Sequence, residues 1–187
     1  MRIVGGRLKG RTLAVPTGLD VRPTADRVRE SVFNILAHGI GDFYIDGATV
    51  IDVFAGTGAL GLEAMSRGCG HGVFIDNDPG ALTCVRKNAG PLGLGRDVTL
   101  LRLDAARLAP PPRAAKAPAA LAFLDPPYES GLVQPALLGL RDKGWLAEGA
   151  VVVCEVAAKE EFAAPKKFKA VDERTYGTAR VVFLKYG

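Results

Sequence analysis

The sequence is poor in residues that bind transition metals or form disulfides: it has three cysteines and two histidines among 187 residues. Cys69, Cys84 and Cys154 are odd in number and far apart, which argues against a disulfide framework and a Cys-x-x-Cys metal site. His38 and His71 have no partner at the spacing of metal ligands. We therefore expect reduced, space-filling cysteines and no bound metal.

Long apolar runs and targeting signals are missing as well. The longest apolar runs have the length of a strand, far below the roughly 20 residues that a membrane-spanning helix needs. Residues 1–6 lead directly into alternating basic and apolar residues, without the apolar core of a secretory signal. With 48% hydrophobic and 24% charged residues, the chain fits one soluble α/β domain. We expect a cytoplasmic protein.

Positive charge is concentrated at the N-terminus. The net charge is +4, but residues 1–29 alone carry seven basic and two acidic side chains, a local balance of +5, and the remainder is close to neutral. Such a segment suits contact with a phosphate backbone, although a solvated basic surface explains the charge equally well. The candidate nucleic-acid contacts are Arg7, Lys9, Arg11, Arg22, Arg27 and Arg29.

The chain before the first strand divides into an arm and a helix. Residues 2–15 alternate apolar and polar residues around glycines, which predicts a short hairpin or extended arm. Thr24 is a plausible N-cap for an amphipathic helix over residues 24–36, with Val28, Val32 and Leu36 on one face. We interpret residues 1–23 as a basic arm and residues 24–187 as the main domain of a single compact unit.

From residue 49 the pattern alternates strands and helices, as in a mostly parallel sheet covered on both faces. Residues 168–174 and 178–186 lie so close together that they predict a C-terminal hairpin, with one strand antiparallel to the rest. Residues 105–119 predict a loop. The expected strands are 49–54, 72–76, 98–103, 121–125 and 150–156, and the expected helices are 59–67, 79–89 and 132–143.

Residues 50–61 form a buried strand, a glycine turn and the start of a helix. Gly56, Gly58 and Gly61 match a dinucleotide-binding fingerprint, because glycine lets the backbone approach a ligand at a helix N-terminus. Asp76 follows Gly56 by 20 residues, at the end of the next strand, where a carboxylate can bind both hydroxyls of a ribose. The motif predicts an adenosine-containing cofactor.

The glycine turn alone does not separate a nicotinamide dinucleotide from S-adenosylmethionine. Asp52, inside the turn's strand, can pair with the ammonium group of S-adenosylmethionine, whereas a pyrophosphate would be repelled there. Asp104 ends the third strand, next to Ala105, and can accept from the adenine amino group. The other cofactor contacts predicted in these loops are Phe54, Ala55, Thr57 and Asn77.

The tetrad Asp125-Pro126-Pro127-Tyr128 follows a buried strand, at the edge where open α/β sheets bind ligands. An exocyclic amine of a base is a poor nucleophile, because its lone pair is delocalised into the ring. The Asp125 carboxylate and the Pro126 carbonyl can accept both N–H groups and localise that lone pair. Tyr128 offers a ring for stacking a flipped-out base. The tetrad therefore predicts amine methylation from S-adenosylmethionine, without a metal.

Residues 22–36 read RPTADRVRESVFNIL and follow IVGG at residues 3–6. Together with the two motifs above, they resemble the bacterial small-subunit ribosomal RNA guanine-N2 methyltransferases of the RsmD type over nearly the whole chain. The resemblance implies a seven-stranded Rossmann-like fold, S-adenosylmethionine as donor, and a guanine of 16S rRNA in the small subunit or its precursor as target. It places Arg22 and Thr24 at the cofactor and base pocket. We expect a monomer.

Three other functions stay open. An adenine-N6 methyltransferase would use the tetrad equally well, but 187 residues leave no room for a target-recognition domain of a sequence-specific DNA enzyme. A nicotinamide oxidoreductase would explain the glycine turn and Asp76, but would leave the tetrad without a role. A non-catalytic RNA-binding assembly factor would not need an intact tetrad.

Overall fold

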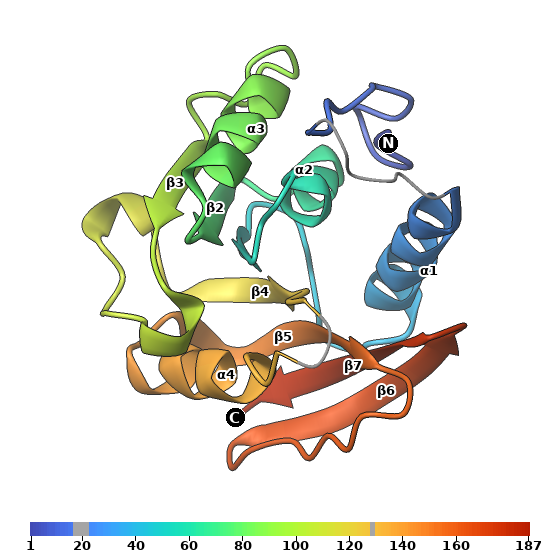
Figure 1. Cartoon of the computed structure of the whole chain (residues 1–187), viewed down its shortest axis with the longest axis vertical. Coiled ribbons are helices and arrows are strands. Elements are labelled where there is room, and N and C mark those ends of the chain that lie inside the picture. The colour runs from blue at the N-terminus through green and yellow to red at the C-terminus, as the bar shows by residue number, and fades with distance from the viewer. Residues whose placement is uncertain (17–22, 128–129) are drawn as a thin grey trace.

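A seven-stranded sheet runs through the protein in the order β3-β2-β1-β4-β5-β7-β6 (Figure 1). The computed structural model describes residues 1–16, 23–127 and 130–187, without the side chains of residues 23–25. Strands β1 to β5 are mutually parallel, and β7 pairs antiparallel with both β5 and β6. The strands are β1 (Thr49–Val53), β2 (His71–Asp76), β3 (Val98–Arg102), β4 (Ala119–Leu124), β5 (Leu146–Ala157), β6 (Phe168–Tyr176) and β7 (Ala179–Tyr186).

Helices cover both faces of the sheet. One face packs against α1 (Pro23–His38), α2 (Ala59–Ser66) and α3 (Pro79–Ala89), and the other packs against α4 (Val133–Asp142) with two short 3-10 turns, Ala105–Arg107 and Arg113–Ala115 (Figure 1). The last four residues of β1 and of β4 are buried, because strands covered on both faces have no solvent side. The doubly covered parallel sheet that the sequence predicts is confirmed.

The carboxyl ends of the strands differ slightly from the predicted ones. Strand β4 ends at Leu124, so Asp125 begins the following loop instead of ending the strand. Strand β5 begins at Leu146 rather than at residue 150, because Leu146 pairs with Ala119 across an irregularity in the register of β4 and β5. The C-terminal hairpin forms as predicted, but its turn consists of Gly177 and Thr178, since β6 continues to Tyr176.

Helix α1 begins at Pro23, one residue before the predicted N-cap, so Thr24 lies in its first turn. Proline is tolerated at the start of a helix, because the first N–H groups have no intrahelical acceptor. On the predicted apolar face, Val32 and Leu36 are buried and Val28 is partly buried; Phe33, which was not predicted for this face, is buried as well. Arg22 lies outside the described residues.

The N-terminal segment is attached to the main body by buried and polar contacts. Its two ends meet in one antiparallel bridge between Arg2 and Thr12, and Ile3 and Leu13 are buried in the core beneath it. The backbone N–H of Leu8 donates to Ser66 Oγ of α2 at 3.0 Å. The segment therefore packs as part of the layer that contains α2 (Figure 1).

All three cysteines are free and buried, as predicted. Burial raises the pKa of Cys69 to about 12 and that of the Cys84 and Cys154 thiols as well, so they stay protonated. In the part of the chain that the structure describes, no helix is both long enough and apolar enough to cross a membrane.

Candidate active site

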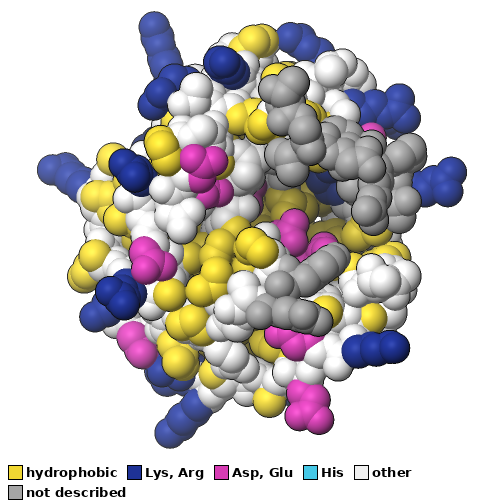
Figure 2. Space-filling model, viewed as in Figure 1, with side chains coloured by type: hydrophobic (Ala, Val, Ile, Leu, Met, Phe, Trp, Pro, Cys, Tyr) yellow, Lys and Arg dark blue, Asp and Glu magenta, His cyan; other side chains and the backbone are white. Residues whose placement is uncertain are grey.

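A cavity of about 1090 Å³ opens at the carboxyl ends of β1, β2, β4 and β5. Both sequence motifs contribute to its wall: the glycine turn that follows β1, and Asp125, Pro126 and Pro127 after the neighbouring strand β4. Figure 2 shows the opening as a central hollow with acidic side chains at it, while Lys and Arg side chains project mainly from the outer edge of the molecule. Predicted cofactor and catalytic residues thus share one space.

The glycine turn is fixed by its own backbone and by packing. Gly58 has φ +77° and precedes α2, a backbone conformation that favours glycine. Gly61, one turn into α2, lies so close to Phe74 that a Cβ atom would approach a ring carbon to 2.5 Å. The absence of side chains therefore brings α2 against the sheet and aims its first N–H groups at the cavity.

Asp76, at the end of β2, links the turn to the next loop. Its Oδ2 accepts from the Gly56 N–H at 3.0 Å and its Oδ1 accepts from the Asp78 N–H at 2.9 Å. The carboxylate also lines the cavity, so its remaining lone pairs face the space where a ribose is predicted. Asn77, beside it, lines the same wall.

Asp52 is the most deeply buried acid of the cavity, with 2% of its surface exposed. Its Oδ2 accepts from the Gly61 N–H at 2.8 Å. Burial raises the pKa of Asp52 to about 8; the Gly61 hydrogen bond partly offsets this, while the nearby charges of Asp125 and Asp76 add to it. A buried carboxyl with an elevated pKa is suited to a ligand cation, which would stabilise its ionised form.

Asp104 and Ala105 follow β3 at the cavity end near Asp76. Asp104 Oδ1 accepts from the Ala106 N–H at 2.9 Å, and Oδ2 lies 4.0 Å from Arg107 Nε. The aspartate therefore caps the 3-10 turn Ala105–Arg107 and still borders the cavity. Apolar side chains of Ile75 and Leu103 form the neighbouring wall, as a flat adenine ring requires.

The predicted cofactor residues Phe54, Ala55 and Thr57 also line the cavity. Gly58 supports the turn behind them. The side chain of Thr24 lies outside the described residues.

Asp125 begins the loop after β4 and keeps contact with water through the cavity. Protein surrounds its other sides, so loss of hydration, reinforced by the negative charge of Glu155, raises the pKa of Asp125 to about 7. Tyr128, the last residue of the tetrad, lies outside the described residues.

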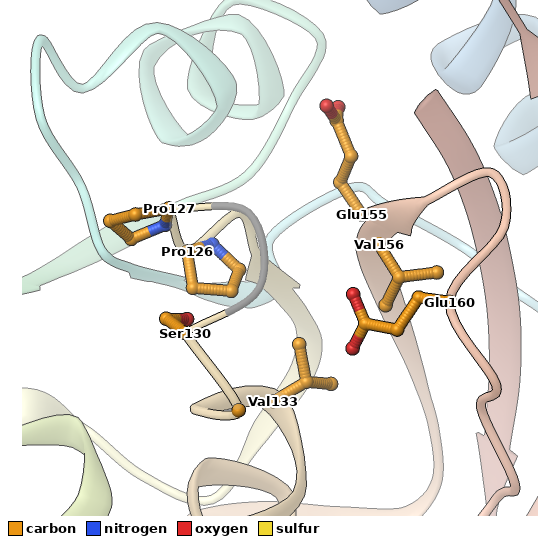
Figure 3. A pocket seen from close by; sticks show the side chains of 8 residues that line it. Pro126, Pro127, Ser130, Val133, Glu155, Val156 and Glu160 are labelled. Atoms are coloured by element: carbon orange, nitrogen blue, oxygen red, sulfur yellow. The ribbon is translucent and has the colours of Figure 1, made fainter. Parts of the chain in front are cut away.

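A second, much smaller pocket lies behind the two prolines (Figure 3). Pro126 and Pro127 share its wall with Val133 of α4 and with Glu160. The Ser130 N–H donates to the Pro127 carbonyl at 3.3 Å, which closes the loop after the tetrad. The fixed φ of two successive prolines, together with this hydrogen bond, limits the motion of the Pro126 carbonyl.

Glu155 of β5, which was not predicted as a site residue, lines the same cavity. Its signal was the same as that of Asp125, an acid at the carboxyl end of an apolar strand, but no recognised motif surrounds it. Val28 of α1 and Tyr176 of β6 were missed as well. The Tyr176 hydroxyl lies 2.6 Å from Ser31 Oγ, so it joins the C-terminal hairpin to α1 at the cavity wall.

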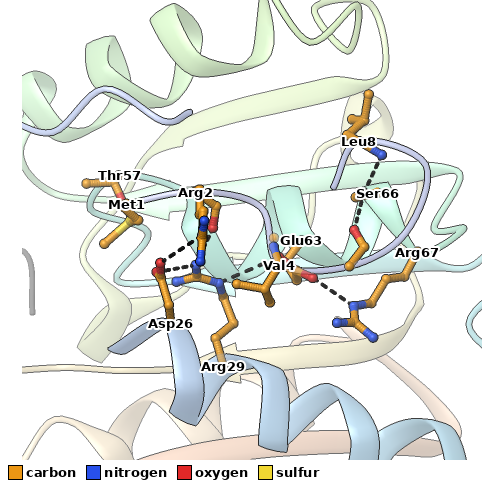
Figure 4. Close-up of polar contacts among 12 residues, drawn as sticks. Met1, Arg2, Val4, Leu8, Asp26, Arg29, Thr57, Glu63, Ser66 and Arg67 are labelled. Carbon is orange, nitrogen blue, oxygen red and sulfur yellow. Dashed lines mark hydrogen bonds and ion pairs between the residues drawn. The ribbon is translucent and has the colours of Figure 1, made fainter. Parts of the chain in front are cut away.

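Arg29 differs from the other predicted nucleic-acid contacts, because its side chain is only 5% exposed. It pairs with Asp26 at 2.8 Å, lies 3.6 Å from Glu63, and donates to the Arg2 carbonyl at 2.5 Å (Figure 4). Glu63 is fully buried and also accepts from the Val4 N–H at 2.8 Å. Arg29 therefore ties α1 and the N-terminal segment to α2, and its guanidinium is already engaged within the protein.

The remaining basic candidates among the described residues lie at the surface. Arg7, Lys9 and Arg27 are exposed, and Arg11 is exposed but donates to the Pro91 carbonyl at 2.7 Å. Within the described ranges, no group of three His, Cys, Asp or Glu side chains is placed to hold a metal.

Comparison with known proteins places this arrangement in a family. The family described as conserved hypothetical protein 95 matches residues 1–185. Ribosomal RNA small subunit methyltransferase D of Escherichia coli K12 is 39% identical over 155 residues, which are 83% of this chain and 74% of that protein. Its counterpart in Haemophilus influenzae is 29% identical over 178 residues, 95% of this chain and 89% of that protein.

Solved structures show the same fold. The Escherichia coli protein yhhF has a TM-score of 0.83 and 30% identity, over 100% of this chain and 97% of that one. An RNA methyltransferase of Salinibacter ruber, solved with S-adenosyl-L-homocysteine, has a TM-score of 0.59 and 18% identity, over 90% of this chain and 94% of that one.

Proposed function

Because the chain belongs to the conserved hypothetical protein 95 family, together with the small-subunit ribosomal RNA methyltransferases D, we propose that it methylates 16S rRNA. The donor is S-adenosylmethionine and the acceptor is the exocyclic N2 of a guanine. The observation that carries the proposal is the single cavity that contains Asp52, Asp76 and Asp104 as well as the Asp125-Pro126-Pro127 loop.

The cavity has the size and the chemistry for this pair of ligands. At about 1090 Å³ it exceeds the upper end of common small-molecule sites, roughly 1,000 Å³, so a cofactor and an inserted base fit together. Asp52 is placed for an ammonium group, Asp76 for ribose hydroxyls and Asp104 for an adenine amino group. When bound, S-adenosylmethionine supplies an electrophilic methyl group on a sulfonium.

Asp125 and Pro126 prepare the amine of the base. The Asp125 carboxylate accepts one N–H and the rigid Pro126 carbonyl accepts the other, which turns the nitrogen toward tetrahedral geometry and localises its lone pair. The methylated nitrogen becomes positively charged and must lose a proton. Asp125, with its pKa raised to about 7, is the nearest acceptor for that proton. We propose that Tyr128 stacks on the base, a contact worth about 1–3 kcal/mol.

Arg7, Lys9, Arg11, Arg22 and Arg27 are proposed to contact RNA phosphates, and the exposed positions of Arg7, Lys9 and Arg27 support this role. We propose the small subunit or its assembly intermediate as the partner, which would place the protein in the cytoplasm.

We propose that the protein works as a monomer, with residues 1–23 as its basic RNA-binding part and residues 24–187 as the methyltransferase domain. Among the described residues, the large hydrophobic side chains that are exposed are Tyr44, Leu138 and Val171. They belong to different elements, which does not favour an apolar interface.

The test is transfer of a labelled methyl group from S-adenosylmethionine to small subunits from cells that lack the activity, followed by mass spectrometry of the nucleosides. We expect N2-methylguanosine at one position of 16S rRNA. N6-methyladenosine would replace the guanine assignment by the adenine one. Absence of label, with RNA binding retained, would favour a non-catalytic assembly factor.

A further inference from the structure

Two carboxylates stand side by side at the base end of the cavity. Strands β4 and β5 are parallel and Leu124 pairs with Cys154, so Asp125, the first residue after β4, and Glu155, within β5, both follow that pair. The residues before the pair, Phe123 and Val153, both pack in the core beneath α1. Because side chains alternate along a strand, Glu155 points to the same face as Val153, and Asp125 lines the same cavity as Glu155.

Glu155 lines both the large cavity and the small pocket behind the prolines. In Figure 3 its carboxylate points away from Val156 and Glu160, which line the smaller pocket. Glu155 borders the large cavity together with Val153 and Val181, the latter its partner on β7. The negative charge of Glu155 also acts on Asp125, in agreement with their closeness.

Two neighbouring acceptors, Asp125 and Glu155, match the Watson–Crick edge of guanine and do not match that of adenine. The Watson–Crick edge of guanine carries adjacent donors, the N1–H and the N2 amino group, whereas adenine has an acceptor at N1 beside its N6 amino group. A carboxylate accepts hydrogen bonds and, when ionised, cannot donate any. Asp125 and the Pro126 carbonyl already account for the two N–H groups of the reacting amine. An acceptor on the neighbouring strand is thus positioned for the next atom of the edge.

We propose that Glu155 accepts the N1–H of the target guanine while Asp125 accepts an N–H of its amino group, so that Glu155 selects guanine over adenine. This inference rests on the proposed guanine-N2 methylation and adds the residue that reads the base. Adenine would place its N1 lone pair against the Glu155 carboxylate. Both of these groups are acceptors, so neither would have a hydrogen-bond donor. A site built around hydrogen bonds to a substrate discriminates strongly against an analogue that lacks the donor.

The decisive substrate is 2-aminopurine, which keeps the N2 amino group of guanine but has an unprotonated N1. Small subunits are reconstituted with 16S rRNA ligated from a synthetic segment that carries guanosine or 2-aminopurine at the mapped target. The initial rate of methyl transfer is measured for the wild type, for Glu155→Gln and for Glu160→Gln. The last is the matched control, because Glu160 belongs to the small pocket outside the cavity.

We expect the wild type and Glu160→Gln to prefer guanosine by about 100-fold or more, as for sites that bind a substrate N–H. Glutamine can donate to an unprotonated N1 as well as accept from N1–H, so Glu155→Gln should reduce this preference to about tenfold or less. Part of this change should be a higher rate of methyl transfer to 2-aminopurine by Glu155→Gln than by the wild type.

Equal rates of the wild type on the two bases would overturn the proposal without any variant. The proposal would also be overturned if Glu155→Gln lowered the rates on guanosine and on 2-aminopurine by the same factor. An equal loss would mean that Glu155 acts only through Asp125 and does not read N1. If the wild type leaves guanosine unmethylated, the proposed function itself is refuted. The experiment thus distinguishes failure of the proposed function from failure of the role proposed for Glu155.

Discussion

Ligand binding should force the buried Asp52 carboxyl to release its proton. In the free protein burial raises the pKa of Asp52 to about 8, so at pH 7 the ionised fraction is about one tenth. A bound ammonium group next to Asp52 would stabilise the carboxylate and lower this pKa far below 7. The protein should then release about 0.9 proton per ligand at pH 7 through Asp52.

The same linkage predicts the pH dependence of affinity. Between pH 6 and 7 the affinity should rise about tenfold per pH unit, because almost one proton leaves for each ligand bound. The rise should level off near pH 8, where Asp52 is half ionised before binding. An α-amino group begins to lose its own proton in the same range, about pH 7.7–8.0.

S-adenosyl-L-homocysteine is the ligand of choice, since it keeps the ammonium group but carries no sulfonium charge that would act on Asp125. Titration calorimetry in buffers of different ionisation enthalpy counts the protons. Asp52→Asn should abolish the release, because its amide does not titrate, while it can still accept from the Gly61 N–H. Asp42→Asn is the matched control, an exposed aspartate with φ +59°, a conformation that asparagine tolerates.

The reasoning fails if the wild type and Asp52→Asn release the same number of protons. It also fails if Asp52→Asn binds S-adenosyl-L-homocysteine as tightly as the wild type at pH 8. Either result would mean that Asp52 does not face the ammonium group and that its hydrogen bond to Gly61 is purely structural.

Four further outcomes follow from the site and its support. Without ligand, the free energy of unfolding in urea should fall by about 1.4 kcal/mol per pH unit between pH 5 and 7 through Asp52, because a raised carboxyl pKa stabilises the fold only while the group is protonated. Asp125→Asn should slow methyl transfer by about 10²–10³-fold and leave S-adenosyl-L-homocysteine affinity nearly unchanged, and the wild-type rate should rise with pH through about 7; a large loss of affinity would contradict the assigned role. Replacing Arg7 and Lys9 by glutamate should reduce the salt dependence of RNA binding by about 0.7–0.9 per lost phosphate contact in a plot of log K against log salt, and an unchanged slope would show a merely solvated surface. Arg29→Met should lower the free energy of unfolding by about 3–5 kcal/mol and leave that slope unaltered.

The local sequence predicts most of the fold because each element carries its own signals. Helix α3 has the predicted bounds: Asp78 caps it by accepting from the Gly80 and Ala81 N–H groups, and Pro79 opens it. The first four residues of β5 were missed, because their pairing with β4 depends on a distant strand and their sequence includes Glu148 and Gly149.

The site was predictable only where residues belong to a recognised local motif. Asp52 and Asp125 were found because a glycine turn and a proline pair stand beside them. Glu155 was missed because its importance comes from the pairing of β4 with β5, which brings it next to Asp125 from 30 residues away. The burial of Arg29 has the same origin: a basic residue in a basic segment suggests a surface position, but Glu63 on α2 pairs with it inside the protein.

The distribution of charge explains how such a site can admit a base and exclude the backbone that carries it. Five of the described residues lining the cavity are acidic, while the basic one, Arg29, is already paired with Asp26. Exposed arginines and lysines lie on the outer surface, toward the edge of the molecule in Figure 2. Phosphates are therefore attracted to the outer surface and repelled from the cavity, whereas N–H donors and cations are favoured inside the cavity. The pyrophosphate of a nicotinamide dinucleotide would meet the same repulsion, and a flipped-out base would not.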